Sequence, residues 1–302
     1  MKTLTVFTPA YNRAHTLKRT YQSLCDQTCK DFEWLIVDDG STDNTRAIVD
    51  DWINERVIPI RYIYQSNQGM HGAHNTAYAN IESELNTCID SDDYMPEDAV
   101  EKIVGFWKNL AEDQKKQYAG VIGLDYADGG GLIGTAFPAE MRETTLQGFY
   151  ETGGKGDKKL VYRTDIIKKY PEYPIFKGER YVGLAYKYML IDQDYKLLTL
   201  NEPLVIVDYQ FDGSSFSMYR QYWNNPKGFA FFRKTEMITT KCLKRKLIVC
   251  AHYVSSAIIS RNKKFLRESP CKAITVMAIP LGILLYLRIC FAVNHNRRMN
   301  IS

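Results

Sequence analysis

The sequence predicts an α/β fold: a mixed, mostly parallel β-sheet with helices on both faces, followed by a basic, helical C-terminal extension. In the first 110 residues, a short apolar run, a polar turn and a helical segment follow one another four times, as in strands buried between helices. With 45% hydrophobic and 25% charged residues, the 302-residue chain can bury a large core, which excludes disordered, collagen-like and polytopic membrane proteins. Residues 1–212 hold 23 Lys and Arg against 33 Asp and Glu, net −10, whereas residues 213–302 hold 16 against two, net +14.

Apolar periodicity places the first four strand–helix units. The expected strands are Leu4–Phe7, Phe32–Val37, Ile60–Tyr64 and Thr87–Ile89, and the expected helices lie around Leu17–Leu24, Ile48–Trp52, His74–Ile81 and Val100–Trp107. In the first helix Leu17, Tyr21 and Leu24 recur at three- and four-residue steps. Asp43 or a neighbouring hydroxyl residue can cap the second helix, and Pro96 suits the start of the fourth.

Beyond residue 110 the alternation becomes irregular. Tyr118–Leu124 is the next expected strand, and Gly129–Gly131 ends the simple pattern. A helix is expected near Tyr181–Ile191 and a strand at Leu204–Val207. After Gly213 three Lys- and Arg-rich helical stretches follow, punctuated by two prolines. We therefore expect one domain over 1–212 and a helical extension over 213–302.

Polar residues collect where the predicted strands end. The end segments are Pro9–Tyr11, Asp38–Asp39, Gln68–Asn75 and Asp90–Asp93, and the carboxyl ends of parallel strands meet at one edge of the sheet. Three acids within four residues repel one another unless a cation is bound. Oxygen ligands favour Mg²⁺ or Mn²⁺ over zinc, and such an ion bridges carboxylates to a diphosphate. The alternative is that these acids are only turn and helix-start residues.

The cysteines and histidines predict no soft-metal site. The seven cysteines are scattered without a C-x₂-C pair, so neither a disulfide framework nor a zinc knuckle is indicated, and a reducing compartment is expected. Leu4–Phe7 is too short for a signal-peptide core. His71 and His74 could share a helix face, but we expect them to pack or to form hydrogen bonds.

These strand ends resemble the family 2 glycosyltransferases, which have the GT-A fold, a Rossmann-like architecture. The resemblance rests on Thr8–Asn12, Ile36–Asp43, Asn67–Asn75 and Asp90–Asp93, which follow in order over roughly the first 110 residues. Phe176–Tyr181 and Asp208–Ser214 resemble a bacterial subgroup that builds surface polysaccharides. The resemblance implies a nucleotide-binding half at 1–110 and an acceptor half at 111–212.

The resemblance also implies a reaction and its residues. A sugar would move, with inversion, from a nucleotide-sugar, most often a UDP-sugar, to an acceptor hydroxyl. Tyr11 would stack on the base, Asp39 would accept the uracil imide hydrogen and Asp38 would be structural. The implied donor-binding residues are Pro9, Tyr11, Asn12, Asp39, Asn75 and Asp90. The implied ligands of a Mg²⁺ or Mn²⁺ ion are Asp90, Asp92 and Asp93.

Glu179 is the candidate catalytic base by its position in the motif. A carboxylate near the acceptor hydroxyl can take the proton released as that hydroxyl attacks. The family often has Asp after this Glu, whereas Arg180 occupies that position here. The alternative is that Glu179, at the head of a predicted helix, only interacts with the helix macrodipole.

The basic extension suggests contact with a membrane. Ala273–Val293 is 21 residues long with Arg288 as its single charge, close to the length of a membrane span. Basic residues flank it and can attract anionic lipid, so we expect a peripheral protein on the cytoplasmic face of the membrane that acts on a saccharide or lipid-linked saccharide. The alternative is a buried helix. We expect no nucleic-acid partner, because no reading motif is present.

Two other functions remain open. A nucleotidyltransferase would carry a Gly-rich, basic phosphate loop after the first strand, and Pro9–Asn12 is not such a loop. A nucleotide-sugar-binding scaffold subunit without catalysis is the stronger alternative. Asp212–Ser215 can be a lid over the donor or a plain surface turn.

Overall fold

The computed structural model describes residues 2–208 and 218–299, with side chains as far as Asn294. The segment Asp212–Ser215, expected as a lid or a turn, lies outside the described residues. The chain divides into two compact units: Met1–Glu172 with Ile191–Gln210, and Tyr173–Leu190 with Phe211–Ser302. The division near residue 210 lies close to the expected boundary at 213, but residues 173–190, expected in the first domain, group with the second unit.

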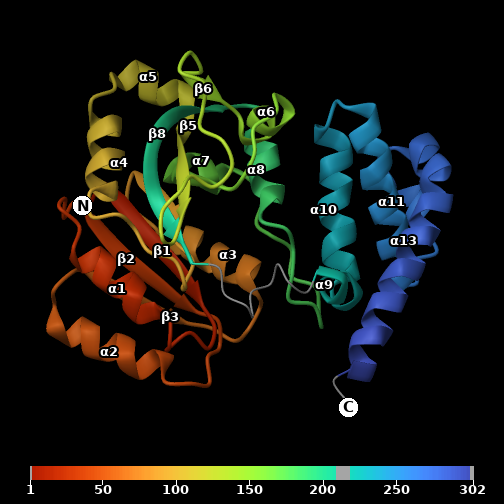
Figure 1. The fold of residues 1–302 in the computed structure, drawn as a ribbon, viewed down its shortest axis with the longest axis horizontal. Coiled ribbons are helices and arrows are strands. Elements are labelled where there is room, and N and C mark those ends of the chain that lie inside the picture. Colours follow the sequence, from red (N-terminus) through yellow and green to blue (C-terminus); the bar gives the residue numbers. More distant parts are fainter. Residues whose placement is uncertain (1, 209–217, 300–302) are drawn as a thin grey trace. The chain divides into compact units, whose positions relative to one another are not determined.

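The first unit is an α/β domain (Figure 1). Its strands are β1 (Leu4–Ala10), β2 (Phe32–Asp38), β3 (Ile60–Tyr64), β4 (Leu85–Cys88), β5 (Tyr118–Ala127), β6 (Glu143–Thr144), β7 (Lys158–Arg163) and β8 (Lys196–Val207). Its helices are α1 (Leu17–Cys25), α2 (Thr45–Glu55), α3 (Met70–Asn80), α4 (Ala99–Lys108), α5 (Glu112–Gln117), α6 (Leu146–Glu151) and α7 (Thr164–Lys169). All four expected strand–helix units are present, with their ends shifted by a few residues.

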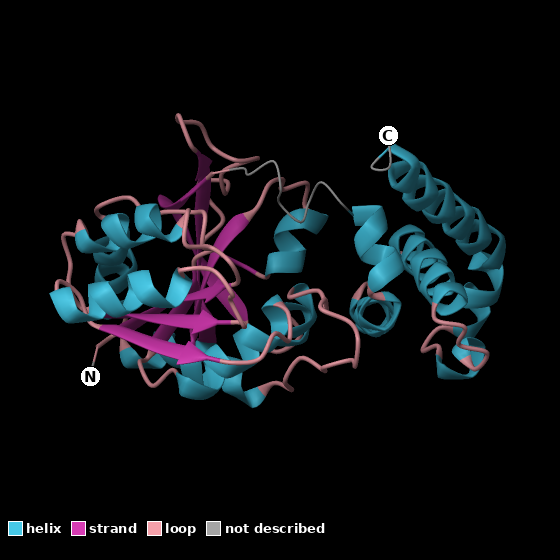
Figure 2. Ribbon diagram, turned by 90° about the horizontal axis from the view of Figure 1, so that it is seen from below, coloured by secondary structure: helices cyan, strands magenta, loops and turns pink. Residues whose placement is uncertain are grey.

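The strands form one mixed, mostly parallel sheet in the described part of the chain, in the order β3-β2-β1-β4-β7-β5-β8-β6; Figure 2 shows them in magenta. β1, β2, β3 and β4 are parallel, as are β5 and β8, while β7 runs antiparallel to both β4 and β5. This arrangement confirms the expected fold class. β7 joins the regular first half of the sheet to the irregular second half.

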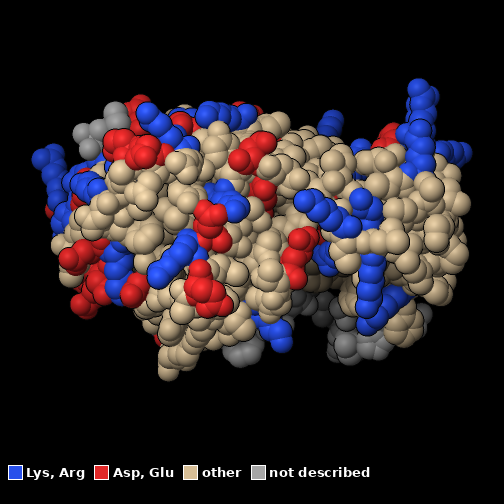
Figure 3. Space-filling model, turned by 90° about the horizontal axis from the view of Figure 1, so that it is seen from above, with Lys and Arg blue, Asp and Glu red and all other residues tan. Residues whose placement is uncertain are grey.

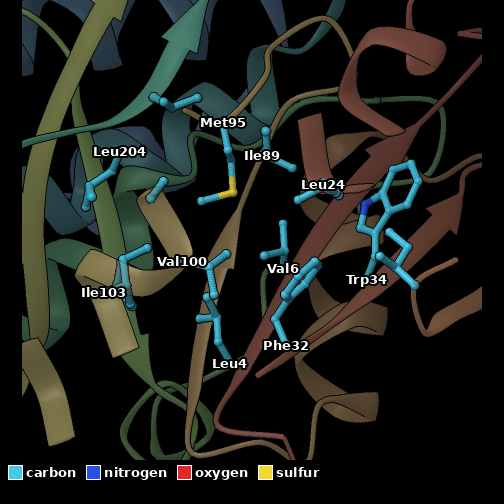
Figure 4. Packing of buried hydrophobic residues seen from close by; sticks show 14 of the residues in the cluster. Leu4, Val6, Leu24, Phe32, Trp34, Ile89, Met95, Val100, Ile103 and Leu204 are labelled. Carbon is cyan, nitrogen blue, oxygen red and sulfur yellow. The ribbon is translucent and has the colours of Figure 1, made fainter. Parts of the chain in front are cut away.

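Helices cover both faces of this sheet. Successive side chains of a strand point to opposite faces, so each face has apolar residues that a helix can bury. On one face, Leu4 and Val6 of β1 pack with the buried apolar residues of α1, α2 and α4 (Figure 4). On the other face, Phe7 contacts the rings of His74 and Tyr78 from α3. Because both faces are covered, nearly all residues of β1, β2 and β4 are buried, and the exposed polar residues gather beyond the strand ends.

The second unit is helical. It comprises α8 (Ala185–Ile191, whose last residue belongs to the first unit), α9 (Met218–Asn224), α10 (Pro226–Thr239), α11 (Leu243–Ile259), α12 (Phe265–Glu268) and α13 (Lys272–Met299). The expected helix over 181–191 begins only at Ala185, so the expectation that Glu179 heads this helix is wrong. Gly178 has φ of 85°, a left-handed conformation that glycine adopts readily, and the residues after it bind the start of α10 instead.

Candidate active site

The edge where β1, β2 and β4 end gathers the residues expected at a donor site. The register pairs Ala10 with Asp38 and Phe7 with Cys88, so the three strand ends are neighbours. The backbone N–H of Asp39 donates to Ala10 O at 2.8 Å, which extends this pairing into the loops. Tyr11, the acidic pair after β2 and the acidic turn after β4 therefore share one edge of the first unit.

The loop after β1 leaves one aromatic ring accessible. Pro9 is buried within β1, opposite Val37, whereas Tyr11 is 50% exposed. Asn12 has φ of 54°, and its Oδ1 accepts a hydrogen bond from Thr42 N at 2.8 Å. Asn12 thus ties the loop after β1 to the loop after β2, and Tyr11 offers a flat apolar surface at the edge.

Asp38 and Asp39 are both buried, at 1% and 3% exposure, and organise neighbouring loops. Asp38 accepts hydrogen bonds from Ser41 N and from the hydroxyl of Tyr62, which agrees with the expected structural role. Asp39 Oδ1 accepts from Gln65 Nε2 and Gln68 N, at 2.7 and 2.8 Å, and its Oδ2 accepts from Gly69 N at 2.7 Å. Asp39 therefore holds residues 65–69 against the end of β2.

The start of α3 contributes packing to this edge. Gly69, with φ of 84°, precedes the helix. His71 and His74 are 1% and 0% exposed, and His74 Nδ1 lies 2.9 Å from Met70 O. The His74 ring also packs edge-on against Phe7. This burial matches the expected packing role, while Asn75 on the same helix is half-buried.

The acidic turn after β4 differs from the expected metal site in the role of Asp93, which was expected to be a metal ligand. Among the described residues, no group of three His, Cys, Asp or Glu side chains is arranged to hold a metal ion. Asp93 is only 7% exposed, and its Oδ1 accepts a hydrogen bond from Asp208 N at 3.1 Å. Asp93 therefore anchors the end of β8, because its buried carboxylate satisfies a backbone N–H there. Of the three expected metal ligands, Asp90, which is exposed, and Asp92, which is half-buried, remain as candidates.

Electrostatics at this turn favour a bound cation. Burial, followed by the charge of Asp90, raises the pKa of Asp92 above its ordinary value. The same two causes raise the pKa of Asp93 to about 7. Ionised carboxylates held close together in a partly buried site disfavour one another, and a cation reverses that effect. Two carboxylates suit Mg²⁺ or Mn²⁺, which commonly keep waters and take their other ligands from substrate phosphates, so Asp90 and Asp92 fit such an ion.

Two cations beside this turn were not identified from the sequence. Lys159 Nζ donates to Cys88 O at 2.5 Å, and its charge opposes the rise in the pKa of Asp93. Arg13, in the loop after β1, opposes the rise in the pKa of Asp92 in the same way. Both residues lie outside the acidic motif. Lys159 could have been found only by knowing that β7 pairs with β4.

Glu179 lies in the second unit and is 6% exposed. Its Oε1 accepts a hydrogen bond from Lys227 N at 3.0 Å, and its Oε2 accepts from Gly228 N at 2.8 Å. These are backbone donors in the first turn of α10. The carboxylate thus caps a helix whose Lys227 lies 48 residues further along the chain, an interaction that no local sequence pattern indicates.

Comparison with known proteins agrees with this geometry. Residues 5–129 match the model of the family described as "Glycosyl transferase family 2". An uncharacterized glycosyltransferase of Nostoc sp. is 35% identical over 186 residues, which cover 57% of this chain and 54% of the relative. A putative teichuronic acid biosynthesis glycosyltransferase, TuaG of Bacillus subtilis, is 36% identical over 34% of this chain and 41% of its own length. The chain thus spans about half the length of these relatives.

Solved structures share the fold at low sequence identity. The crystal structure of S. aureus TarS 1-349 in complex with UDP-GlcNAc has a TM-score of 0.60 at 19% identity, covering 92% of this chain and 79% of the TarS 1-349 chain. A mannosyltransferase from Pyrobaculum calidifontis, in complex with GDP-Man and Mn²⁺, has a TM-score of 0.53 at 14% identity, covering 93% of this chain and 87% of its own.

Proposed function

The chain belongs to the family 2 glycosyltransferases through residues 5–129, and from this premise we propose that it transfers a sugar from a nucleotide-diphosphate sugar to an acceptor hydroxyl. We propose UDP as the nucleotide, inversion at the anomeric carbon, and a glycan or lipid-linked saccharide as acceptor. The observation that carries the proposal is the shared edge of β1, β2 and β4, where Tyr11, Asp39 and the acidic turn at Asp90–Asp92 come together. The structure of TarS with UDP-GlcNAc supports the choice of nucleotide.

The nucleoside would occupy the ends of β1 and β2. The half-exposed ring of Tyr11 can stack on the base, with Pro9 fixing the backbone before it. Asp39 accepts the uracil imide hydrogen, and its bonds to residues 65–69 hold its carboxylate in place. Asn12 and Asn75 complete the proposed donor-binding set, Asn12 by fixing the loop that carries Tyr11.

The diphosphate would lie at the acidic turn. Asp90 and Asp92 would hold Mg²⁺ or Mn²⁺, which supplies positive charge to the leaving diphosphate. Arg13 and Lys159 add fixed positive charge at the same edge. Because negative charge develops on UDP as the glycosidic bond breaks, charges already in place lower the barrier more than charges that must first reorganise.

Glu179 remains our proposed base, although both of its oxygens bind backbone N–H groups of α10. To accept a proton from the acceptor hydroxyl, the carboxylate would have to exchange one of these bonds for that hydroxyl. This observation also favours the second candidate function, a nucleotide-sugar-binding subunit that does not transfer sugar. Transfer by a folded Glu179→Gln variant at the wild-type rate would show that Glu179 is not the base.

Ligand binding tests the proposal directly. We expect UDP and one UDP-sugar to raise the melting temperature of the full chain more strongly with Mn²⁺ than without it, because a ligand that binds only the folded state stabilises it. Asp92→Asn should remove the Mn²⁺-dependent part. Asp51→Asn, which changes an exposed carboxylate on α2, is the matched control. A wild-type chain that binds no nucleotide, or an Asp92→Asn variant with the full Mn²⁺ effect, would contradict the proposal.

We also propose that α13 binds the surface of the cytoplasmic membrane, as a peripheral anchor. Within the described residues, Lys272–Asn294 contains an 18-residue window with a mean hydropathy of 2.2, and this span is long and apolar enough to cross a membrane, by length and composition only. One face of α13 packs within the second unit, where Ala278 and Ile289 are fully buried. On the other face Met277, Leu284 and Phe291 are 70%, 62% and 73% exposed.

The two faces favour a helix lying on lipid over one that spans it. Exposed apolar stripes of this length are unusual on soluble surfaces, and an interfacial helix buries such a stripe in the headgroup region. Among residues 213–302, 16 are Lys or Arg and two are Asp or Glu; Figure 3 shows the basic side chains of the molecule in blue. Basic residues attract anionic lipid.

Flotation with vesicles tests this anchor. We expect the full chain to float with phosphatidylglycerol-containing vesicles and to remain at the bottom with phosphatidylcholine vesicles at high salt. A variant with Met277, Leu284 and Phe291 changed to Ser should lose flotation. Val57→Ser, which alters a residue of the first unit that is 56% exposed, should float like the wild type. Flotation of the triple variant at the wild-type level would contradict an α13 anchor.

A further inference from the structure

Asp125, near the end of β5, is a buried carboxylate that the proposed roles leave unused. Its side chain is 6% exposed. Within the described part of the chain its Oδ1 has no hydrogen-bond partner. Burial raises the pKa of Asp125 to about 6. A buried carboxylate oxygen without a donor is costly to keep, which indicates that a bound group supplies the donor during function.

The sheet register brings Asp125 to the active-site edge. Val161 of β7 pairs with Thr87 of β4 on one side and with Val121 of β5 on the other. Two residues from Val161 toward the edge, Lys159 pairs with Gly123 and donates to the carbonyl oxygen of Cys88 at the end of β4. Asp125 lies two residues beyond Gly123 and therefore at the edge where the acidic turn begins.

The charges around Asp125 agree with this position. The charge of Lys159 lowers the pKa of Asp125, while the charges of Asp157 and Asp90 raise it. The neighbouring Lys158 does not neutralise it by a hydrogen bond, because Lys158 Nζ donates to backbone carbonyl oxygens, including Ile133 O at 3.2 Å and Lys155 O at 2.9 Å. Asp125 is thus an acceptor within electrostatic reach of Asp90, held in place by strand pairing.

We infer that Asp125 accepts a hydrogen bond from a hydroxyl group of the sugar being transferred. The inference rests on the proposed function, which places the diphosphate at Asp90 and Asp92. A sugar attached to that diphosphate would enter the edge beside Asp125, whose side chain is 6% exposed. A site built to bind a hydroxyl discriminates strongly against sugars without it, so Asp125 would help to select the donor.

The experiment measures donor binding without acceptor, in the full chain with Mn²⁺. For the UDP-sugar that binds the wild type most tightly, we expect Asp125→Asn to weaken binding by about tenfold or more, the usual range for a lost bond to a charged acceptor. Binding of UDP alone should stay within about twofold of the wild type. Asp157→Asn, an exposed carboxylate nearby, is the control and should bind both ligands normally.

Donor analogues then identify the hydroxyl. Against UDP-sugars that lack or invert one hydroxyl at a time, the wild type should lose affinity for one analogue, and Asp125→Asn should lose little further affinity for that same analogue. Unchanged UDP-sugar binding by a folded Asp125→Asn variant would overturn the inference, including the case in which only transfer is lost, since that result assigns Asp125 to the acceptor. An equal loss of UDP binding would also overturn it. A wild type that binds no nucleotide-sugar would instead overturn the proposed function.

Discussion

Removal of the Glu179 carboxylate should destabilise the helical unit, whatever the catalytic role of this residue. α10 begins at Pro226, and the first N–H groups of a helix have no partner within the helix. The N-cap residue Asn225 makes no side-chain cap to α10, because its Oδ1 accepts from Arg180 N at 2.7 Å. Glu179 therefore supplies the acceptors that the N-cap residue does not.

The size of the effect follows from these contacts. A hydrogen bond to a charged group contributes about 1.5–3 kcal/mol, and loss of a capping side chain typically costs about 1 kcal/mol. Because the two bonds share one carboxylate and are not additive, we expect Glu179→Ala to lower the free energy of unfolding by about 3 kcal/mol. Glu179→Gln keeps one acceptor oxygen and places an NH₂ group against the other backbone N–H, so we expect it to cost about half as much.

Urea unfolding of the full chain, followed by circular dichroism at 222 nm, measures this loss. Glu172→Ala, in the exposed segment before the helical unit, is the control and should fall within about 0.5 kcal/mol of the wild type. A Glu179→Ala variant as stable as this control would refute the capping argument. Activity answers a separate question: a folded Glu179→Gln variant that binds donor normally but transfers roughly 100- to 10,000-fold more slowly would support the role of base.

Two further predictions concern packing and pH. A Cβ atom at Gly282 of α13 would lie 2.5 Å from Val254 Cβ of α11, so Gly282→Ala should lower the free energy of unfolding by about 1–3 kcal/mol. Gly105→Ala is the control: a Cβ atom there meets nothing within 4 Å, so this change should stabilise α4 by up to about 1 kcal/mol. Equal effects of the two changes in urea unfolding would contradict the close packing of α11 and α13. Burial raises the pKa of Asp192 to about 6, so at intermediate pH the native state keeps a proton that the unfolded chain has released. The free energy of unfolding should therefore fall by roughly 3 kcal/mol as pH rises from about 3 to 7. Urea midpoints across this range should depend less on pH for Asp192→Asn, and an unchanged slope would contradict the burial argument.

The sequence alone predicted the regular half of the fold and the sheet edge at which we propose the donor site. Strands β1 to β4 and helices α1 to α4 follow from apolar periodicity, because each element buries a face that its own residues define. The acidic turn after β4 and the exposed Tyr11 follow from the rule that parallel strands end at one edge. Both predictions depend on residues that are close together in the chain.

Tertiary structure decided the rest. Lys159 and Asp125 reach the edge of the proposed donor site only because β7 lies between β4 and β5 and pairs antiparallel with both. Glu179 meets the start of α10 only after the helical unit has assembled. α13 likewise acquires one packed and one exposed apolar face by packing within that unit, although its sequence is apolar on both sides. Each outcome depends on pairing between distant segments, and local periodicity and motif spacing carry no information about such pairing.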